Sequence, residues 1–577
     1  MSTSPQPDLR AHLAGLLRAA LPAEAAGAAI ALERPKQSQH GDYACNVALL
    51  LAKPLRQNPR AIAQALIAAL PASPYLERAE VAGAGFINFY LKPAAKQQVV
   101  AQVMAAASRY GRSVQGRKKK VQVEFVSANP TGPLHVGHGR GAAYGASLAN
   151  ILDAVGFAVQ REYYVNDAGR QMDILALSTW LRYLEHCGIT AVFPANAYRG
   201  GYVRQMAGEL RAGHDRRFVR ELPAEFQLTP ADEQQEAHLD ALIARTKVLL
   251  GADYATVHAF ALHAQLADCR EDLAEFGVTF DNWYSEQSLY DSARVERAVG
   301  RLEAAGHIET RDGAKWFRST AFGDEKDRVV QRENGQYTYF ASDIAYHLDK
   351  FERGFDLVID IWGADHHGYI PRVKGALAAL GQNPAQLTIA LVQFAVLYRG
   401  GEKVSMSTRA GEFVTLRELR KEVGNDAARF FYVLRKSDQH LDFDLDLAKS
   451  QSNDNPVYYV QYAHARVCSV FEQWRGDVLE LAGADLALLA SAHEMALLAR
   501  LIEYPETVEA AARDYAPHLI AFYLKDLAQE FHSYYTAEQF LVPDPALRLA
   551  RLALIAAVRQ VLINGLALLG VGAPEKM

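Results

Sequence analysis

The chain has 577 residues and a mass of 63.6 kDa, enough for about four domains of roughly 150 residues. Hydrophobic residues make up 50% and charged residues 22%, which excludes a wholly disordered chain. Its 61 basic and 66 acidic side chains give a formal charge of −5. That balance excludes a uniformly basic nucleic-acid binder but allows a localised basic face.

The cysteines and apolar segments exclude further classes. The 4 cysteines lie far apart and no pair has CxxC spacing, so we expect neither a zinc ribbon nor a disulfide framework. The first residues lack the basic and apolar regions of a signal peptide. Arg559 and Asn564 interrupt the apolar tract near the C-terminus. We therefore expect a soluble, cytoplasmic protein without a membrane partner.

Residues 1–112 form the first predicted unit. Leucines and isoleucine recur at helical spacing in residues 9–17 and 62–70, and residues 85–91 alternate as in a strand. These features predict an N-terminal α+β module. A basic run at residues 117–120 follows, which we interpret as a solvated linker.

After this linker the pattern alternates between strands and helices. Residues 121–125 and 158–165 predict two strands with a long helix between them, and strand-like runs return at 357–362 and 388–398. That order predicts a doubly wound parallel sheet of the Rossmann-like type, in a domain that spans residues 118–447.

Two other regions differ in composition. Residues 170–330 are more helical and polar, which predicts an insertion in the domain of the parallel sheet. Residues 448–577 are rich in Ala and Leu and poor in Pro, which predicts an all-α bundle. The predicted fold class is multidomain α/β, with the α+β module before the parallel sheet and the bundle after it.

Two histidines, His135 and His138, lie where the first predicted core strand has ended and a helix begins. A helix N-terminus presents free N–H groups and a partial positive charge, so it favours an anion. Imidazoles at that position can donate hydrogen bonds to phosphate oxygens. Gly137 and Gly139 lack side chains, which would let a nucleotide approach closely. The pattern favours a phosphate site.

Two other interpretations of the histidine pair stay open. It could be half of a metal site, although the Glu of HExxH is absent and the spacing fixes no third ligand. It could also be a structural pair. The Pro/Gly loop before it and the glycine-rich start of the helix favour phosphate.

The segment His135-Val-Gly-His138 resembles the HIGH signature of class I aminoacyl-tRNA synthetases. The preceding residues 127–134 (SANPTGPL) resemble the version of that signature in arginyl-tRNA synthetases. The resemblance implies that both histidines are catalytic and that they bind ATP together with Gly137 and Gly139.

The second signature of that class, KMSKS, aligns with residues 403–409 (KVSMSTR). The resemblance implies that Met406 and Ser407 bind ATP. The second signature lysine is replaced by Thr408, which removes a cation that would stabilise charge on the phosphates. The bare pattern would also suit a polar hairpin turn. The side chains that could supply the missing cation are Lys403 and Arg409.

Residues 336–344 (QYTYFASDI) carry a tyrosine and a carboxylate at helical spacing. A guanidinium needs a carboxylate for its forked N–H groups and an aromatic or polar wall. Tyr339 and Asp343 would share one helix face, as would an ordinary cap and a core aromatic. In arginyl-tRNA synthetases the corresponding YxxxD residues contact the substrate guanidinium, and the resemblance implies that role here.

The resemblance implies further contacts with arginine. It assigns Ser127, Asn129 and His138 to the amino-acid end of the substrate. Residues 362–368 (WGADHHG) close a strand, where ligands of open α/β sheets bind. His366 is the candidate contact there, and we interpret the Asp/His cluster as hydrogen-bonding groups, with metal binding as the alternative.

The bundle resembles the DALR-type anticodon-binding domain of the same family. Residues 455–466 contain three tyrosines and an arginine. Single-stranded bases could stack on the tyrosine rings, although tyrosines at this spacing also occur in helix cores. The N-terminal module resembles the domain that grips the tRNA elbow, where Asn88 would read a base. The candidate tRNA contacts of the bundle are Tyr458, Tyr459, Tyr462 and Arg466.

Together these resemblances cover almost the whole chain in the family's domain order. They imply activation of L-arginine by ATP to arginyl-adenylate and transfer to the tRNA specific for arginine, by a monomer that uses Mg²⁺ with ATP and holds no structural metal. Three alternatives stay open: a nucleotidyltransferase with the same sheet, a synthetase for another amino acid, and a non-catalytic RNA-binding paralogue.

Overall fold

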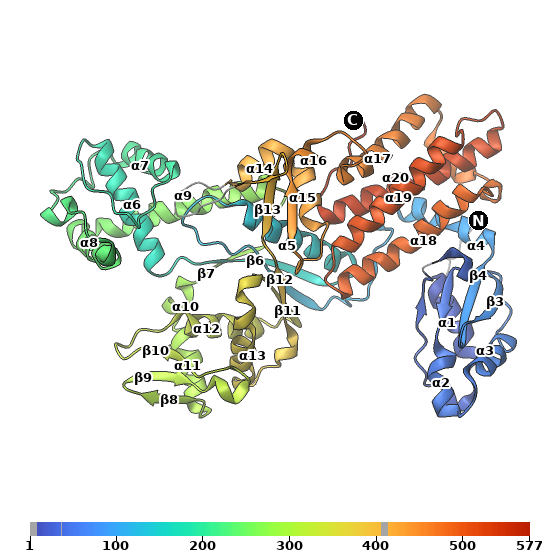
Figure 1. The fold of residues 1–577 in the computed structure, drawn as a ribbon, viewed down its shortest axis with the longest axis horizontal. Helices are drawn as coiled ribbons and strands as arrows, with labels where there is room; N and C mark the ends of the chain where they lie inside the picture. The colour runs from blue at the N-terminus through green and yellow to red at the C-terminus, as the bar shows by residue number, and fades with distance from the viewer. Residues whose placement is uncertain (1–7, 36, 405–413) are drawn as a thin grey trace.

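The structure is a computed structural model that describes residues 8–35, 37–404 and 414–577. Figure 1 shows an elongated molecule with the α/β domain at its centre. Helices α6 to α8 extend from one side of it, and the C-terminal bundle lies on the other side, with the N-terminal module beneath the bundle.

The N-terminal module is an antiparallel sheet of order β1-β2-β4-β3 with three helices. Residues 86–91 form the strand that their alternation predicts. Its core is separate from the rest of the protein and ends at Leu91. The elements are α1 (Leu9–Ala20), β1 (Leu32–Glu33), β2 (Tyr43–Cys45), α2 (Val47–Leu55), α3 (Pro59–Ala68), β3 (Leu76–Ala82) and β4 (Phe86–Leu91).

Helix α4 (Pro93–Ala106) belongs to the C-terminal bundle rather than to this module. Its buried valines join the large core that contains the bundle helices. The Gln97 amide donates to the carbonyl oxygen of Leu489 at 2.9 Å, and the Asn564 amide donates to that of Ala107 at 2.9 Å. The helix thus packs with the bundle, while the core of the α+β module ends at Leu91.

The catalytic domain is built on five parallel strands in the order β12-β11-β5-β6-β7. The chain runs from β5 outward through β6 and β7, then returns to β11 on the other side of β5. This topological switch between β5 and β11 confirms the doubly wound sheet. The strands are β5 (Lys120–Glu124), β6 (Ala158–Val165), β7 (Asn282–Ser285), β11 (Leu357–Gly363) and β12 (Leu387–Val392).

Helix α5 (Val136–Ala154) packs along the sheet after β5. Leu148, Ile151 and Leu152 are buried, as their spacing predicts. Gly145 allows this close packing, because a Cβ there would lie 2.3 Å from the ring of Phe125. The start of α5 is thereby fixed beside the carboxyl end of β5.

Strand β7 divides the predicted insertion into two parts. The sequence did not reveal β7, because its four residues, NWYS, are too short to show a clear alternation. Before it come α6 (Arg170–His186), α7 (Gly201–His214), α8 (Gln235–Leu250) and α9 (Asp253–Glu275). After it come α10 (Gln287–Asp291), α11 (Arg294–Ala304) and the sheet of β8 (Ile308–Arg311), β9 (Ala314–Phe317) and β10 (Arg328–Gln331).

The rest of the catalytic domain places α12 (Tyr339–Glu352) before β11 and α13 (Ile370–Ala379) after it. A small sheet of order β14-β13-β15 follows. The remaining elements of this part are β13 (Ala395–Arg399), β14 (Glu402–Lys403), α14 (Leu416–Val423), α15 (Asn425–Val433), β15 (Leu441–Asp444) and α16 (Leu445–Lys449).

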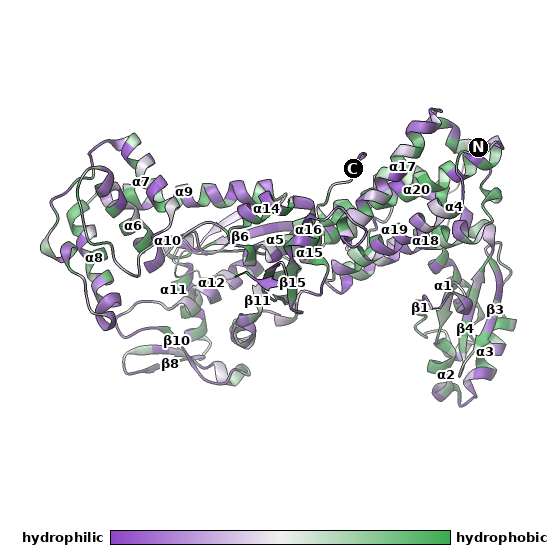
Figure 2. Cartoon of the chain, turned by 45° about the horizontal axis from the view of Figure 1, so that its top comes forward, coloured by the Kyte–Doolittle hydropathy of each residue, from purple (hydrophilic) through white to green (hydrophobic). Residues whose placement is uncertain are grey.

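The C-terminal bundle consists of α17 (Pro456–Trp474), α18 (Ala492–Arg513), α19 (His518–Ala537) and α20 (Pro545–Leu569). Hydrophobic residues recur along these helices (Figure 2). Within the described part of the chain, α20 alone is long and apolar enough to cross a membrane, and 78% of its apolar window is buried inside the protein. Its apolar surface thus belongs to the bundle core.

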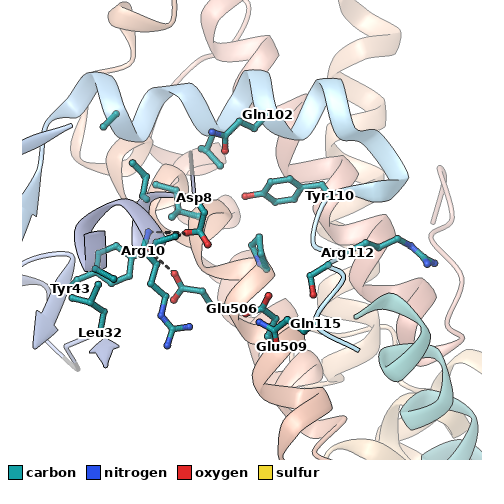
Figure 3. A pocket seen from close by; sticks show the side chains of 18 of the residues that line it. Asp8, Arg10, Leu32, Tyr43, Gln102, Tyr110, Arg112, Gln115, Glu506 and Glu509 are labelled. Atoms are coloured by element: carbon teal, nitrogen blue, oxygen red, sulfur yellow. Dashed lines mark hydrogen bonds between the residues drawn. The ribbon is translucent and has the colours of Figure 1, made fainter. Parts of the chain in front are cut away.

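The N-terminal module is joined to α18 by an ion pair. Arg34 donates to Glu506 at 2.9 Å and to the hydroxyl of Tyr43 at 2.7 Å, and that hydroxyl donates to Glu506 at 2.6 Å. A cavity of about 520 Å³ lies at this junction, and Figure 3 shows Gln102 of α4 and Glu506 of α18 among its lining residues.

Candidate active site

His135 is the N-cap of α5, and His138 lies one turn into the helix. Nδ1 of His135 accepts from the amide of Gly137 at 3.1 Å, while Nδ1 of His138 accepts from the amide of His135 at 3.3 Å. The two rings stack, with centroids 3.7 Å apart. This reciprocal capping fixes both imidazoles at the positive end of the helix dipole.

Both histidines are neutral at physiological pH. Burial lowers the pKa of His135, and burial together with the neighbouring His135 lowers the pKa of His138 to about 3. Because Nδ1 of each ring accepts a backbone hydrogen bond, the single ring proton belongs on Nε2. Each neutral ring can therefore donate from Nε2 to an anion.

The glycines of the signature differ in what they make room for. A Cβ on Gly137 would lie 2.8 Å from the His135 ring, so glycine allows that ring to fold over the helix start. A Cβ on Gly139 would lie 2.8 Å from both Leu416 and the Tyr432 hydroxyl. Gly139 therefore lets α5 pack closely against α14 and α15.

The loop between β5 and α5 begins with an unusual backbone. Val126 and Ser127 both have positive φ, at 69° and 41°, although neither is glycine. Such backbone strain is typical of functional sites. The hydroxyl of Ser127 donates to Glu124 at 2.9 Å and accepts from the amide of Tyr164 at 3.1 Å. Asn129, in the same loop, is exposed.

Tyr339 and Asp343 lie one turn apart at the start of α12. Tyr339 is 60% exposed, and its hydroxyl lies near Gly169 at the start of α6. Asp343 is half-buried and accepts from the Tyr369 hydroxyl at 2.5 Å. Burial raises the pKa of Asp343 above its ordinary value, because it disfavours the charged form. A bound cation such as a guanidinium would stabilise the carboxylate.

A buried ion network holds α12 against the sheet. The ammonium of Lys350 contacts Asp360 at 2.6 Å and also contacts Glu124, the strand-end residue that binds Ser127. Burial would raise the pKa of Asp360, but Lys350 and His347 together outweigh it and lower that pKa to about 2. The network links the helix of Tyr339 and Asp343 to the loop of Ser127.

Replacing Lys350 by Met is expected to lower the free energy of unfolding by about 3–5 kcal/mol, because Asp360 and Glu124 would stay buried without their cation. Denaturant unfolding of the catalytic domain measures this loss. Lys449→Met is the control, since Lys449 is 38% exposed where it pairs with Glu422, and it should cost at most about 1 kcal/mol. Equal losses in the two variants would contradict the role of the network.

Glu286 is a site residue that the sequence did not single out. It follows β7, is 2% exposed and accepts from Ser342 at 3.1 Å, one residue before Asp343. Burial raises its pKa to about 7, with the Asp343 charge acting in the same direction. The missed signal was a carboxylate at the end of a strand that was itself too short to predict.

The other predicted residues of the active site are exposed or lie outside the described residues. His366 is exposed and lies 3.7 Å from Asp365. Lys403 is exposed in β14, paired in register with Tyr398 of β13. No group of three or more His, Cys, Asp or Glu able to hold a metal occurs among the described residues. Met406, Ser407, Thr408 and Arg409 lie outside the described residues.

The predicted tRNA contacts of α17 share one face of the helix. Tyr458 and Tyr462 stack with centroids 5.8 Å apart, and the guanidinium of Arg466 lies 4.4 Å from the Tyr462 ring. Tyr459 lies beside His532, with ring centroids 4.6 Å apart. All four predicted side chains are half-buried, whereas Asn88 of the N-terminal module is 5% exposed.

Comparison with known protein families matches three consecutive parts of the chain. Residues 7–91 match the arginyl tRNA synthetase N-terminal domain, residues 99–190 and 256–441 match the class I (R) tRNA synthetase catalytic domain, and residues 460–577 match the DALR anticodon binding domain. With the switched parallel sheet and the capped histidine pair, these matches define a class I aminoacyl-tRNA synthetase. Membership of this class implies ATP as a substrate.

Full-length relatives give the family. The chain is 67% identical to the arginine–tRNA ligase of Nitrosospira multiformis over 578 residues, 99% of each chain. It is 66% identical to that of Azoarcus sp. over 591 residues, 100% of each. The Thermus thermophilus arginyl-tRNA synthetase structure aligns with a TM-score of 0.76 and 25% identity, over 99% of this chain and 100% of that one. The chain belongs to the arginyl-tRNA synthetase family.

Proposed function

We propose that this chain ligates L-arginine to the tRNA specific for arginine, in two steps that consume ATP. The observation that carries the proposal is the pair of half-buried and buried carboxylates, Asp343 and Glu286, beside the exposed ring of Tyr339. A guanidinium is planar, always charged and matched to carboxylate oxygens. Such a site favours arginine over amino acids without a cationic side chain.

In the first step, a carboxylate oxygen of arginine attacks the α-phosphorus of ATP. The bond from that phosphorus to the bridging oxygen of diphosphate breaks, and diphosphate leaves with the electron pair. Nε2–H groups of His135 and His138 donate to the phosphate oxygens, where negative charge develops. Catalysis then comes from positioning and charge stabilisation rather than from a covalent enzyme intermediate.

In the second step, a ribose hydroxyl of the 3′-terminal adenosine of tRNA attacks the carbonyl carbon of arginyl-adenylate. The carbon–oxygen bond to the phosphate breaks, the hydroxyl proton passes to a phosphate oxygen or to water, and AMP leaves. Ser127, Asn129 and His138 hold the amino-acid end of the substrate in this proposal, with His366 as a further contact. Ser127 is already oriented by its hydrogen bond to Glu124.

The remaining roles concern ATP and tRNA. Gly137, Gly139, Met406 and Ser407 contact ATP, with Mg²⁺ bound to its phosphates, and Lys403 or Arg409 replaces the signature lysine. The stacked face of α17 reads bases of the anticodon, and Asn88 contacts the elbow. These tRNA contacts are Tyr458, Tyr459, Tyr462 and Arg466. The proposal includes a monomer in the cytoplasm.

Arginine-dependent exchange of label between diphosphate and ATP, measured with and without unmodified tRNA specific for arginine, tests this function. Exchange that requires arginine and tRNA together supports it, and so does exchange with arginine alone. Exchange with another amino acid contradicts the assignment of Tyr339 and Asp343. Silence with all amino acids, alongside intact tRNA binding, favours a non-catalytic paralogue.

The value of kcat/KM for arginine is expected to fall as the pH drops through about 7. The pKa of Glu286 in the free protein is about 7, so below that pH the carboxyl gains a proton and loses its charge for the guanidinium. Above pH 7 the carboxylate form predominates and kcat/KM reaches a plateau. Steady-state kinetics between pH 6 and 8.5 measure this profile.

Glu286→Gln is the comparison for that profile. The amide cannot titrate, so its kcat/KM should be low and flat across the same pH range. A wild-type profile that is flat between pH 6 and 8 would contradict a role for Glu286 in binding arginine.

A further inference from the structure

Residues 191–255 lie in the gap between the two matched segments of the family's catalytic domain, 99–190 and 256–441. We call these residues the helical lobe. It contains α7, α8 and two short turns, Ala224–Gln227 and Asp232–Gln234, and it packs on α6 and α9. Trp180 of α6 and Phe218 and Phe226 of the lobe are buried in a core of their own. In Figure 1 the lobe lies at the left end of the molecule, where α7 and α8 are coloured teal to green.

One side chain of the lobe reaches the loop that precedes the histidine pair. The hydroxyl of Tyr202, in the first turn of α7, donates to the carbonyl oxygen of Thr131 at 2.6 Å. Tyr202 is half-buried against a small core that includes Met172 and Val203. Thr131 lies two residues after Asn129, and its amide donates back to the Asn129 carbonyl at 2.8 Å.

Both sides of this contact leave room for the tyrosine ring. A Cβ on Gly132, in the loop that precedes the histidine pair, would lie 3.2 Å from the Tyr202 hydroxyl oxygen. A Cβ on Gly200, in the lobe, would lie 2.4 Å from the edge of the same ring. A side chain at residue 200 would displace the ring, and one at residue 132 would press on its hydroxyl group, so small residues accompany the ring in both the lobe and the loop.

A second tyrosine, from the core sheet, binds another carbonyl group of the loop that precedes the histidine pair. The hydroxyl of Tyr163, on β6, donates to the carbonyl oxygen of Ala128 at 2.8 Å. Two phenols thus hold two carbonyl groups that flank Asn129, one from the core sheet and one from the lobe. Burial raises the pKa of Tyr202, so its hydroxyl keeps the proton that it donates.

Ion pairs fix the lobe to the helix that passes the arginine site. Arg170, in the first turn of α6, contacts Asp240 at 2.5 Å and Glu236 at 2.7 Å, both on α8. Asp173 accepts from Tyr254 at 2.5 Å and from Lys247 at 2.8 Å. Because α6 begins beside Tyr339, the lobe, the loop and the guanidinium site form one connected unit.

We propose that Tyr202 is a positioning residue for arginine activation, which holds the loop of residues 128–134, and through it Asn129 and His135, in the geometry for adenylate formation. The inference rests on the proposed function and adds a residue outside the matched catalytic domain. A displacement of a positioned group by about 1 Å can cost up to a hundredfold in rate. Loss of the hydrogen bond from Tyr202 to Thr131 would let the loop move, so the rate of adenylate formation should fall while the protein stays folded.

Tyr202→Phe removes the hydroxyl and keeps the ring. We expect kcat for adenylate formation to fall about tenfold, with KM for tRNA unchanged within about twofold. Tyr183→Phe is the matched control, because the Tyr183 hydroxyl also donates to a backbone carbonyl at 2.6 Å, that of Asp215. Asp215 is the C-cap of α7, whereas Tyr202 lies in its first turn. This control should lose thermal stability and keep kcat.

Hydrogen–deuterium exchange of peptides that cover residues 126–138 gives a measurement independent of activity. Exchange should rise in Tyr202→Phe and stay at the wild-type level in Tyr183→Phe. Unchanged exchange in Tyr202→Phe, or equal losses of kcat in the two variants, would overturn the proposal. Wild-type protein that fails to activate arginine would refute the proposed function, while the exchange result would still decide whether Tyr202 holds the loop.

Discussion

Asp343→Asn should lower kcat/KM for arginine by about a hundredfold or more. The carboxylate is half-buried at the start of α12, and burial raises its pKa above the ordinary value although the Tyr369 hydroxyl and Lys350 act in the opposite direction. An amide carries no charge and cannot form an ion pair, so the substrate cation would be desolvated with Glu286 as its remaining carboxylate, at a cost of about 2–5 kcal/mol. Steady-state kinetics of arginine activation measure the change, which should appear mainly in KM.

Glu352→Gln is the control for Asp343. Glu352 lies at the other end of α12, where it pairs with Arg301 at 2.7 Å and is 46% exposed. Removal of that charge should change kcat/KM for arginine less than twofold. If Asp343→Asn kept wild-type arginine affinity, the guanidinium would have to bind elsewhere and the assignment of Tyr339 would fail with it.

His138→Ala is expected to lower kcat for adenylate formation by about 10²–10³-fold at saturating arginine. The Nε2–H group of the neutral ring donates to oxygens on which charge develops, and loss of one such donor has an effect of this size. The variant also loses the acceptor for the His135 amide, which disturbs the other ring of the pair. Single-turnover measurement of adenylate formation separates this step from product release.

The pH profile distinguishes a neutral donor from an imidazolium. With its pKa at about 3, His138 stays neutral between pH 6 and 8, so kcat at saturating arginine should show no transition from this group. An imidazolium mechanism would instead make kcat fall as the pH rises through about 6.5. His440→Ala, on the surface beside Asp442, should leave kcat unchanged.

The parts of the fold that sequence predicted best are those with a strong local pattern. The strand of residues 158–165 has the predicted bounds of β6, and the inward face of α5 is buried as expected. Strand β7 was missed because four residues carry too little periodicity. The packing of α4 on the bundle was not predicted, because the partners of this helix lie hundreds of residues later in the chain. A local sequence pattern does not show which distant elements pack together.

In the candidate site too, residues within local motifs were predicted and residues brought together by long-range contacts were not. Contiguous motifs gave His135, His138, Tyr339 and Asp343, since each pair lies within one turn of a single helix. Glu286 was not predicted, because its place near Asp343 depends on how β7 pairs with β6. The contact of Tyr202 with Thr131 joins residues 71 positions apart, which no spacing rule reveals.

The position of α4 has a consequence for how the chain is made. The buried face of this helix is completed by α18 and α20, the second of which is the last helix of the protein. At about 5–20 residues per second, synthesis of the chain between α4 and α20 takes tens of seconds. During that time the valines of α4 lack their partners, while the α+β module before it already has its whole core. The nascent protein therefore exposes an apolar segment that a chaperone can bind until translation ends.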